Sequence, residues 1–295
     1  MLDVKVSPLQ IAKKRKETQF VIVSRRLLKN PSAVIGLVVA TLLVLMAIFA
    51  PLIIPYDIDE QDLFNTRAAP SIEHPFGTDE LGRDVLSRVV YGSRFSLSIG
   101  VLSVLVGTTI GMLFGAIAGY FGGATDNIIM RFIDVLQSIP GILLAITVSV
   151  VLGPGFFNSM LALAIGAIPM SARLLRASIL GIRTEEYLEA AISINASTPR
   201  IILRHVLPNC FAPVLVSATM MVGHVILGAA MLSFIGLGIQ PPTPEWGAMI
   251  AGGRSLIRSA PHMVTFPGIF IMLAVLSVNL FGDGLRDALD PKLKK

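Results

Sequence analysis

Long runs of uncharged residues alternate with short charged segments along the chain. Five runs contain no Asp, Glu, Lys or Arg, and they cover residues 30–56, 95–125, 135–172, 205–244 and 259–282. A helix needs roughly 20 apolar residues to cross the hydrocarbon core of a bilayer, so each run can hold at least one span. The pattern predicts an all-α protein that crosses a membrane several times.

Two of these runs are too long for a single helix, and both contain strong helix breakers. Gly153-Pro154-Gly155 divides the third run, and the fourth ends in a segment that contains Gly236, Gly238 and Pro241-Pro242. Proline lacks a backbone donor and glycine is costly inside a helix, so the third run divides into two spans. Six spans are expected, at residues 33–54, 96–118, 134–152, 157–174, 211–235 and 263–282.

The placement of the basic residues predicts how these spans are oriented. Six spans put both termini on one side, which then carries 18 of the 24 Lys and Arg residues. Basic residues collect on the cytoplasmic side, so both termini are expected there. The basic run at residues 13–16 is interpreted as an interfacial anchor or as a solvated tail. This topology also explains the net charge of +5 without a nucleic-acid partner.

These predicted boundaries divide the chain into four parts. Residues 1–30 form a cytoplasmic tail, and residues 31–94 hold the first span and an outer loop. Residues 95–283 form the core transmembrane domain, which includes an inner loop at residues 173–210. Residues 284–295 form a second cytoplasmic tail.

The residues available for chemistry are few. Cys210 is the single cysteine, so no disulfide framework or multi-cysteine metal site is expected. The predicted span cores hold no carboxylate, which disfavours an ion-coupled carrier, and His224 is interpreted as a neutral side chain bonded to a neighbouring helix. Residues 77–84 imitate a phosphate-binding loop but have Arg83 and Asp84 where Lys and Ser or Thr are needed.

Five glycines in and just after the second predicted span recur at every fourth position. This spacing places them on one helix face and creates a groove for another helix backbone. The groove can serve an interface with a subunit or gate, or packing within this chain; the sequence leaves both open. The five are Gly107, Gly111, Gly115, Gly119 and Gly123.

The inner loop predicts two short helices with a sharp corner between them. Thr184 can cap the first helix, and Asn195 can end it because asparagine tolerates the left-handed conformation. Thr198-Pro199 can begin the second, with proline at its permitted first position. Such an element is well shaped for insertion into a cleft of a partner.

This loop resembles the EAA loop in the permease subunits of bacterial ABC importers, on the residues Glu189-Ala190-Ala191 and Leu207-Pro208. Asn195 stands where that family usually has glycine. The resemblance implies a six-span permease fold of type I and a loop that sits in a groove of a cytoplasmic ATPase. It assigns the coupling role to Glu189, Ala190, Ala191, Asn195, His205, Leu207 and Pro208.

Two further segments resemble the C-type permeases of the dipeptide, oligopeptide and nickel branch. These are residues 74–88, HPFGTDELGRDVLSR, and residues 232–247, LSFIGLGIQPPTPEWG. The first is expected to form a turned, charge-paired outer loop, either a rigid cap or a lid or docking surface for a binding protein. Trp246, in the second, is interpreted as an interfacial anchor. The proposed docking residues are Gly77, Thr78, Asp79, Gly82, Arg83 and Asp84.

The resemblance implies a permease subunit for short peptides in a bacterial or archaeal cytoplasmic membrane. Its expected partners are a homologous B-type permease, two ATPase subunits and an extracytoplasmic substrate-binding protein. No cofactor and no catalytic or metal-binding residue is expected in this chain, because ATP and magnesium belong to the ATPases. A permease for nickel or a metal chelate is the alternative within the family, and an ATP-independent channel or scaffold is the alternative outside it.

Overall fold

The computed structural model describes residues 19–289, so the basic run at residues 13–16 lies outside the described part. Within this part the chain is helical, and the pair Thr78 and Asp84 forms an isolated β-bridge. The helices are α1 (Gln19–Lys29), α2 (Pro31–Ile53), α3 (Val85–Phe121), α4 (Gly123–Ser138), α5 (Gly141–Leu152), α6 (Phe156–Ile182), α7 (Glu186–Ser193), α8 (Thr198–Ile201), α9 (Leu207–Phe234), α10 (Trp246–Gly253) and α11 (His262–Leu289). A π-helical turn, Ile202–Val206, joins α8 to α9.

Five segments of the described chain are long and apolar enough to cross a membrane. They are α2, α3, α6, the continuous stretch Thr198–Phe234, and α11. Each of the five contains a predicted span to within one residue. Several of these helices are longer than the predicted spans, because a helix can continue through charged residues that lie beyond the uncharged run. α3 begins at Val85 instead of residue 96, and α6 ends at Ile182 instead of residue 174. The predicted domain boundary at residue 94 therefore falls inside α3.

The third predicted span, residues 134–152, is wrong as a single straight helix. α4 and α5 meet at an angle of 88° across Ile139 and Pro140, and together they account for the sixth possible crossing. Proline disfavours helical backbone in the residue before it, and Ile139 has an extended backbone, with φ −91° and ψ 126°. Residues 119–133, which connect the second and third predicted spans, lie largely in the helix α4.

Because α4 belongs to this bent pair, charged side chains lie within a candidate span. Asp126 of α4 binds Arg176 of α6 through both carboxylate oxygens, and Asp134 pairs with Arg173. Asp126 precedes the predicted span 134–152 and Asp134 is its first residue, so both carboxylates lie outside its uncharged core. A charge inside a membrane protein is tolerated when it is paired, and these two pairs join α4 to α6.

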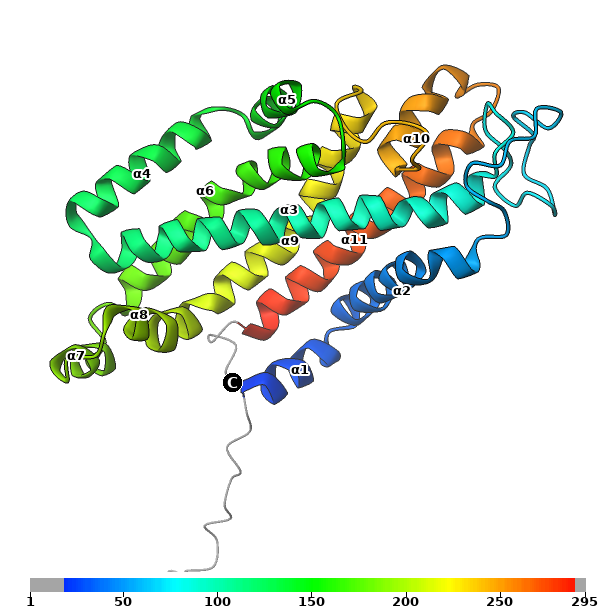
Figure 1. The fold of residues 1–295 in the computed structure, drawn as a ribbon. Coiled ribbons are helices and arrows are strands. Elements are labelled where there is room, and N and C mark those ends of the chain that lie inside the picture. The colour runs from blue at the N-terminus through cyan, green and yellow to red at the C-terminus, as the bar shows by residue number, and fades with distance from the viewer. Residues whose placement is uncertain (1–18, 290–295) are drawn as a thin grey trace, which may run out of the picture.

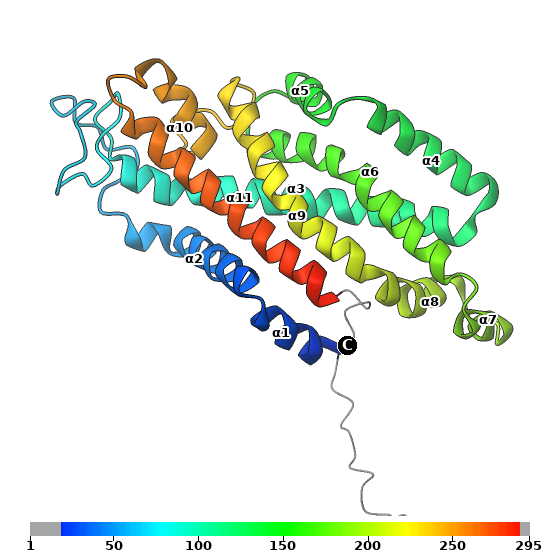
Figure 2. The same ribbon diagram turned by 180° about the vertical axis from the view of Figure 1, so that it is seen from behind.

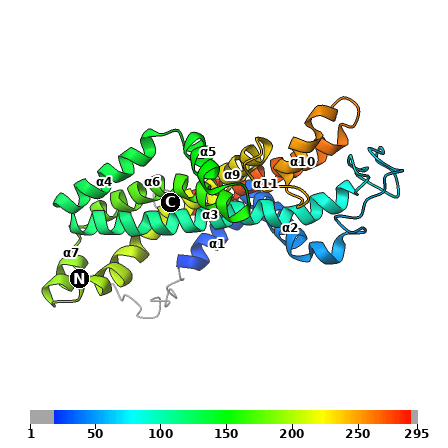
Figure 3. The ribbon, with the colours of Figure 1, turned by 45° about the horizontal axis from the view of Figure 1, so that its top comes forward.

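The helices form an elongated bundle with different elements at its two ends (Figure 1). α1, α7 and α8 lie at one end, which we call the α7 end, and α10 with the loop of residues 54–84 lies at the other, the α10 end. α3 runs along the bundle and packs against α6, α9 and α2. α11 lies between α2 and α9 (Figure 2), and α5 lies beside α6 and α9 (Figure 3).

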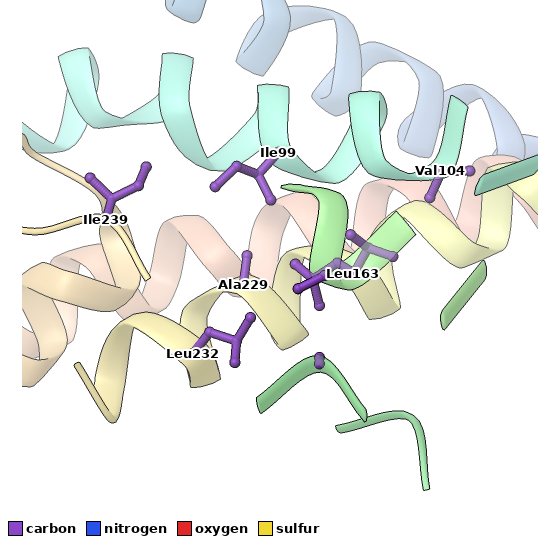
Figure 4. Packing of buried hydrophobic residues seen from close by; sticks show 9 residues of the cluster. Ile99, Val104, Leu163, Ala229, Leu232 and Ile239 are labelled. Atoms are coloured by element: carbon purple, nitrogen blue, oxygen red, sulfur yellow. The ribbon is translucent and has the colours of Figure 1, made fainter. Parts of the chain in front are cut away.

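Apolar side chains from three helices meet in the middle of the bundle. Ile99 and Val104 of α3 lie near Leu163 of α6 and near Ala229 and Leu232 of α9 (Figure 4). Burial of such side chains stabilises a soluble protein by roughly 25 cal/mol per Å², whereas close packing dominates between helices in lipid. This cluster fixes the positions of α3, α6 and α9 relative to one another.

Four of the five regularly spaced glycines lie where α3 packs on α6. A Cβ on Gly107 would lie 2.3 Å from the carbonyl oxygen of Ala164, and one on Gly115 would lie 2.4 Å from that of Ala172. Gly111 and Gly119 approach α6 in the same way. The helix that fills this groove therefore belongs to the same chain, so these four residues serve packing within the chain.

Gly123 is wrongly included in this seam. It follows the end of α3 and has a positive φ of 55°, and a Cβ placed on it would meet no atom within 4 Å. The four-residue spacing continues past the point where the helix stops at Gly122, so spacing alone could not exclude it.

Candidate functional site

The corner between α7 and α8 has the geometry that the sequence predicts. α7 begins at Glu186, two residues after the expected cap Thr184, and ends at Ser193. Asn195 follows in the left-handed region with φ 56°, and the amide of Ala196 donates to the carbonyl of Ala191 at 3.2 Å. This is the longer hydrogen bond of a Schellman motif. α8 then starts at Thr198, with Pro199 in its first turn.

One face of this corner is buried and the other is exposed. Leu188 and Ala191 pack with Ile201, Val206 and Cys210 against the α6 residues Leu175 and Ile179. The side chains of Glu189, Ala190 and Asn195 are exposed, and Ile194 is 80% exposed. The buried face fixes the corner on the bundle, and the exposed face is available to another molecule.

The predicted coupling residues therefore divide between these two faces. Glu189, Ala190, Asn195 and Pro208 are exposed, whereas Ala191 is buried. His205 and Leu207 are half-buried at the π-helical turn, where the His205 carbonyl accepts a hydrogen bond from the Asn209 side chain at 2.7 Å. Sequence reasoning missed Ile194 as part of the exposed face. The apolar character of a residue at a helix end could have indicated it.

At the α10 end, the loop of residues 54–84 is tightly turned and charge-paired, as predicted. Asp79 accepts hydrogen bonds from the Arg83 side chain at 2.7 Å and from the backbone amides of Leu81 and Arg83. Asp84 caps α3 by accepting a hydrogen bond from the amide of Ser87 at 2.7 Å. Its Oδ1 lies 2.9 Å from Nδ1 of His74. Since Thr78, Asp79 and Asp84 are buried, these three side chains hold the loop in shape and offer little surface for docking.

A buried polar network joins this loop to the segment before α10. Arg88 is 4% exposed and donates to the carbonyl oxygens of Ile58 at 2.6 Å and Pro242 at 2.9 Å. Glu245 is buried, accepts from the hydroxyl of Ser96 at 2.9 Å and caps α10. Buried charged groups must find such partners. The network ties both recognised sequence motifs to the beginning of α3.

Trp246 is not an interfacial anchor, contrary to the sequence-based expectation. It is fully buried and donates from Nε1 to the carbonyl of Val89 at 2.9 Å. Gly92 lies directly beneath this segment, with the carbonyl of Pro244 3.3 Å from the position of a Cβ. The neighbouring prolines and glutamate indicated an interface, but Trp246 is part of the core of the α10 end.

A Gly82→Ala variant is expected to destabilise the α10 end. Gly82 has φ 74°, and a Cβ there would lie 1.8 Å from the carbonyl oxygen of Asp62. The expected loss is on the order of 1–3 kcal/mol, measured as a lower thermal unfolding midpoint of the purified chain. Gly252→Ala is the control, since Gly252 lies at the same end with open space around it. Equal midpoints for both variants would contradict the structural role of Gly82.

A cavity of about 700 Å³ lies between α5, α6 and α9. Its lining is mostly apolar and includes Met170, Met220, Met221 and Met231, with Ser217 and His224 as polar members. Binding sites for small molecules typically have this size and this balance of apolar and polar groups. The cavity is therefore a candidate path or binding site for a ligand.

The sequence suggested that His224 bonds to a neighbouring helix, but within residues 19–289 its hydrogen bond is to its own helix. Its Nδ1 lies 3.3 Å from the carbonyl of Met220 in its own helix, and its side chain is exposed at the cavity. Thr109, Thr147 and Thr219 likewise donate to carbonyls four residues earlier in their own helices. In the described part of the chain, the polar side chains that line this cavity are those of Ser217 and His224.

The chain matches two known families over most of its length. Residues 111–295 match the binding-protein-dependent transport system inner membrane component family, and residues 18–70 match the N-terminal transmembrane domain of oligopeptide transport permease C. The dipeptide transport system permease protein DppC of Alkalihalophilus pseudofirmus is 46% identical over 92% of this chain and 89% of its own length. The glutathione transport system permease protein GsiD of Escherichia coli is 49% identical over the same shares.

A solved structure supports the fold independently. A chain from the inward-facing MetNI methionine ABC transporter aligns with a TM-score of 0.55 and 19% identity, covering 69% of this chain and 97% of that one. The apolar helices, the fold and the family matches together define a multi-pass helical membrane permease. The chain belongs to the binding-protein-dependent transport system inner membrane component family, which confirms the family resemblance of its sequence motifs.

Proposed function

We propose that this chain is the C-type permease subunit of an ABC importer for short peptides. The similarity to permeases for a dipeptide and for glutathione, at 46% and 49% identity, carries this proposal. Both cargoes are short peptides, so we propose short peptides as the class of cargo. The cavity between α5, α6 and α9 supports it, since about 700 Å³ lies within the range of sites for small ligands.

In the proposed arrangement the chain crosses the cytoplasmic membrane of a bacterium or archaeon six times, with α4 and α5 as one bent span. The α7 end, with both termini, faces the cytoplasm, in agreement with the distribution of Lys and Arg. A homologous B-type permease completes the path. A substrate-binding protein delivers the peptide at the α10 end, which carries the recognised outer motifs.

Two partner ATPases supply the energy in this mechanism, with ATP and magnesium bound in those subunits. Each ATPase receives the corner of one permease, and in this chain the exposed Glu189, Ala190, Ile194 and Asn195 make that contact. The buried side of the corner packs on α6 and α9, so movement of the ATPase displaces these helices. The permeases then alternate between outward-open and inward-open states as rigid bodies.

Uptake into membrane vesicles tests this function. The chain is co-expressed with its cognate permease, ATPases and binding protein, and radiolabelled alanyl-phenylalanine and glutathione serve as probes. We expect accumulation of at least one probe with ATP, no accumulation with ADP, and co-purification of the ATPases. Uptake without nucleotide would indicate a channel instead. Failure to accumulate either probe with ATP would contradict a peptide importer.

A further inference from the structure

His224 occupies an unusual position in the cavity between α5, α6 and α9. Most of the wall is formed by aliphatic side chains, methionines and glycines, and the polar side chains among the lining residues are those of Ser217 and His224. Ionisable side chains inside membrane proteins are rare and face cavities or partners. Because His224 is exposed to this cavity, packing alone does not explain its presence there.

The hydrogen bond to Met220 determines which ring nitrogen of His224 remains available as an acceptor. A carbonyl oxygen can only accept, so Nδ1, 3.3 Å from the Met220 carbonyl, carries the hydrogen and donates it. In the neutral ring Nε2 then has a lone pair and no hydrogen. Within the described residues, no hydrogen-bond donor to Nε2 is found. The cavity thus presents one imidazole acceptor without a protein partner.

We propose that His224 is a specificity-determining residue whose Nε2 accepts a hydrogen bond from the α-ammonium group of the peptide cargo as it passes through the cavity. This inference rests on the proposed peptide import. Every short peptide with a free N-terminus carries that donor, whatever its side chains. An imidazole acceptor at a fixed position therefore binds the part that all these cargoes share.

The remainder of the wall suits the variable part of the cargo. Met170, Met220, Met221 and Met231 line the cavity, and methionine side chains are flexible, polarizable and able to repack around different apolar groups. Gly141, Gly166 and Gly228 leave the backbone close to the cavity surface. The wall tolerates many side chains, while His224 makes a directional contact with the α-ammonium group.

Vesicles of the complete transporter test this role with alanyl-phenylalanine and glutathione as probes. The variants are His224→Leu, which removes the acceptor, and His224→Gln, which retains an acceptor oxygen. We expect His224→Leu to reduce uptake about tenfold, as loss of a hydrogen bond to a charged group does. ATP hydrolysis stimulated by the loaded binding protein should stay at the wild-type rate. His224→Gln should restore most of the uptake.

Thr219→Val is the matched control, because Thr219 lies on the same helix and bonds only to the Leu215 carbonyl among the described residues. It should transport at the wild-type rate. A parallel loss of ATP hydrolysis in His224→Leu would indicate a structural role and overturn the proposal. Unchanged uptake by His224→Leu would overturn it as well.

His224→Lys tests the polarity of the contact. An ammonium at this position would repel the cargo's ammonium, so uptake should be as low as in His224→Leu. Uptake by the Lys variant together with loss in the Gln variant would mean that the cargo's carboxylate is recognised, which contradicts the proposal. If the wild type transports neither probe, the proposed function itself fails, and this outcome is distinct from a failure confined to the His224 variants.

Discussion

An Asn195→Val variant is expected to hydrolyse ATP without importing peptide. Asn195 holds φ 56° between α7 and α8, a conformation that asparagine tolerates and a β-branched residue resists. Valine would therefore change the direction in which α8 leaves the corner and shift the exposed face that we assign to the ATPase contact. The measurement is the ratio of peptide uptake to ATP hydrolysis in vesicles, which should fall by at least tenfold.

The matched control for this variant is Asn195→Gly. Glycine adopts positive φ without strain, and it is the residue that the EAA resemblance leads us to expect at this position. Its coupling ratio should equal or exceed that of the wild type. Membrane insertion of both variants should be normal, because Asn195 lies outside the five long apolar segments, the nearest of which begins at Thr198. A normal ratio in Asn195→Val would refute the importance of this backbone conformation.

A Gly107→Ala variant is expected to weaken the packing of α3 on α6. The added methyl group would lie 2.3 Å from the carbonyl oxygen of Ala164 and 2.7 Å from the Ala167 Cβ. The backbone carbonyl cannot turn aside as a flexible side chain can, so the two helices must separate. Overpacking of this kind costs about 1–3 kcal/mol, which should lower the thermal unfolding midpoint of the chain in detergent.

Gly181→Ala is the matched control. It makes the same substitution but is not expected to lower the thermal unfolding midpoint. Gly181 lies in α6, and a Cβ there meets no atom within 4 Å. Alanine is a better helix former than glycine by about 0.5–1 kcal/mol, so this variant should be as stable as the wild type or more so. If Gly107→Ala and Gly181→Ala shift the midpoint in the same direction, the close contact between α3 and α6 does not limit stability.

The apolar pattern predicted most of the long helices because length and charge are local properties. α2 and the apolar part of α9 fall near their predicted positions. The sequence analysis missed the bend between α4 and α5. The uncharged run of residues 135–172 indicated a continuous span across Pro140, although proline there indicated a break. The predicted second and fourth spans also stop short of the charged ends of α3 and α6, since a helix does not stop where the membrane does.

The candidate sites differ in how far the sequence could define them. Backbone conformation is set by neighbouring residues, so the corner at Asn195 could be predicted from the preferences of Thr, Asn and Pro. Glu245 and Ser96 are far apart in the chain but share a hydrogen bond, and no local pattern reports such a contact. For the same reason the glycine spacing predicted a groove on α3 without identifying α6 as its occupant.

Because of its length, α3 connects the α7 end and the α10 end as a single stiff rod. Its first turn is capped by Asp84 within the network of the α10 end, and near its last turn Tyr120 packs against the cluster that holds Leu188 and Ala191. With 37 residues in one helix, the rod is roughly 55 Å long. A rigid helix tilts as one body, so a tilt at one end of α3 also displaces its other end. In the proposed transporter, cargo delivery at the α10 end and ATPase closure at the α7 end would therefore both move α3.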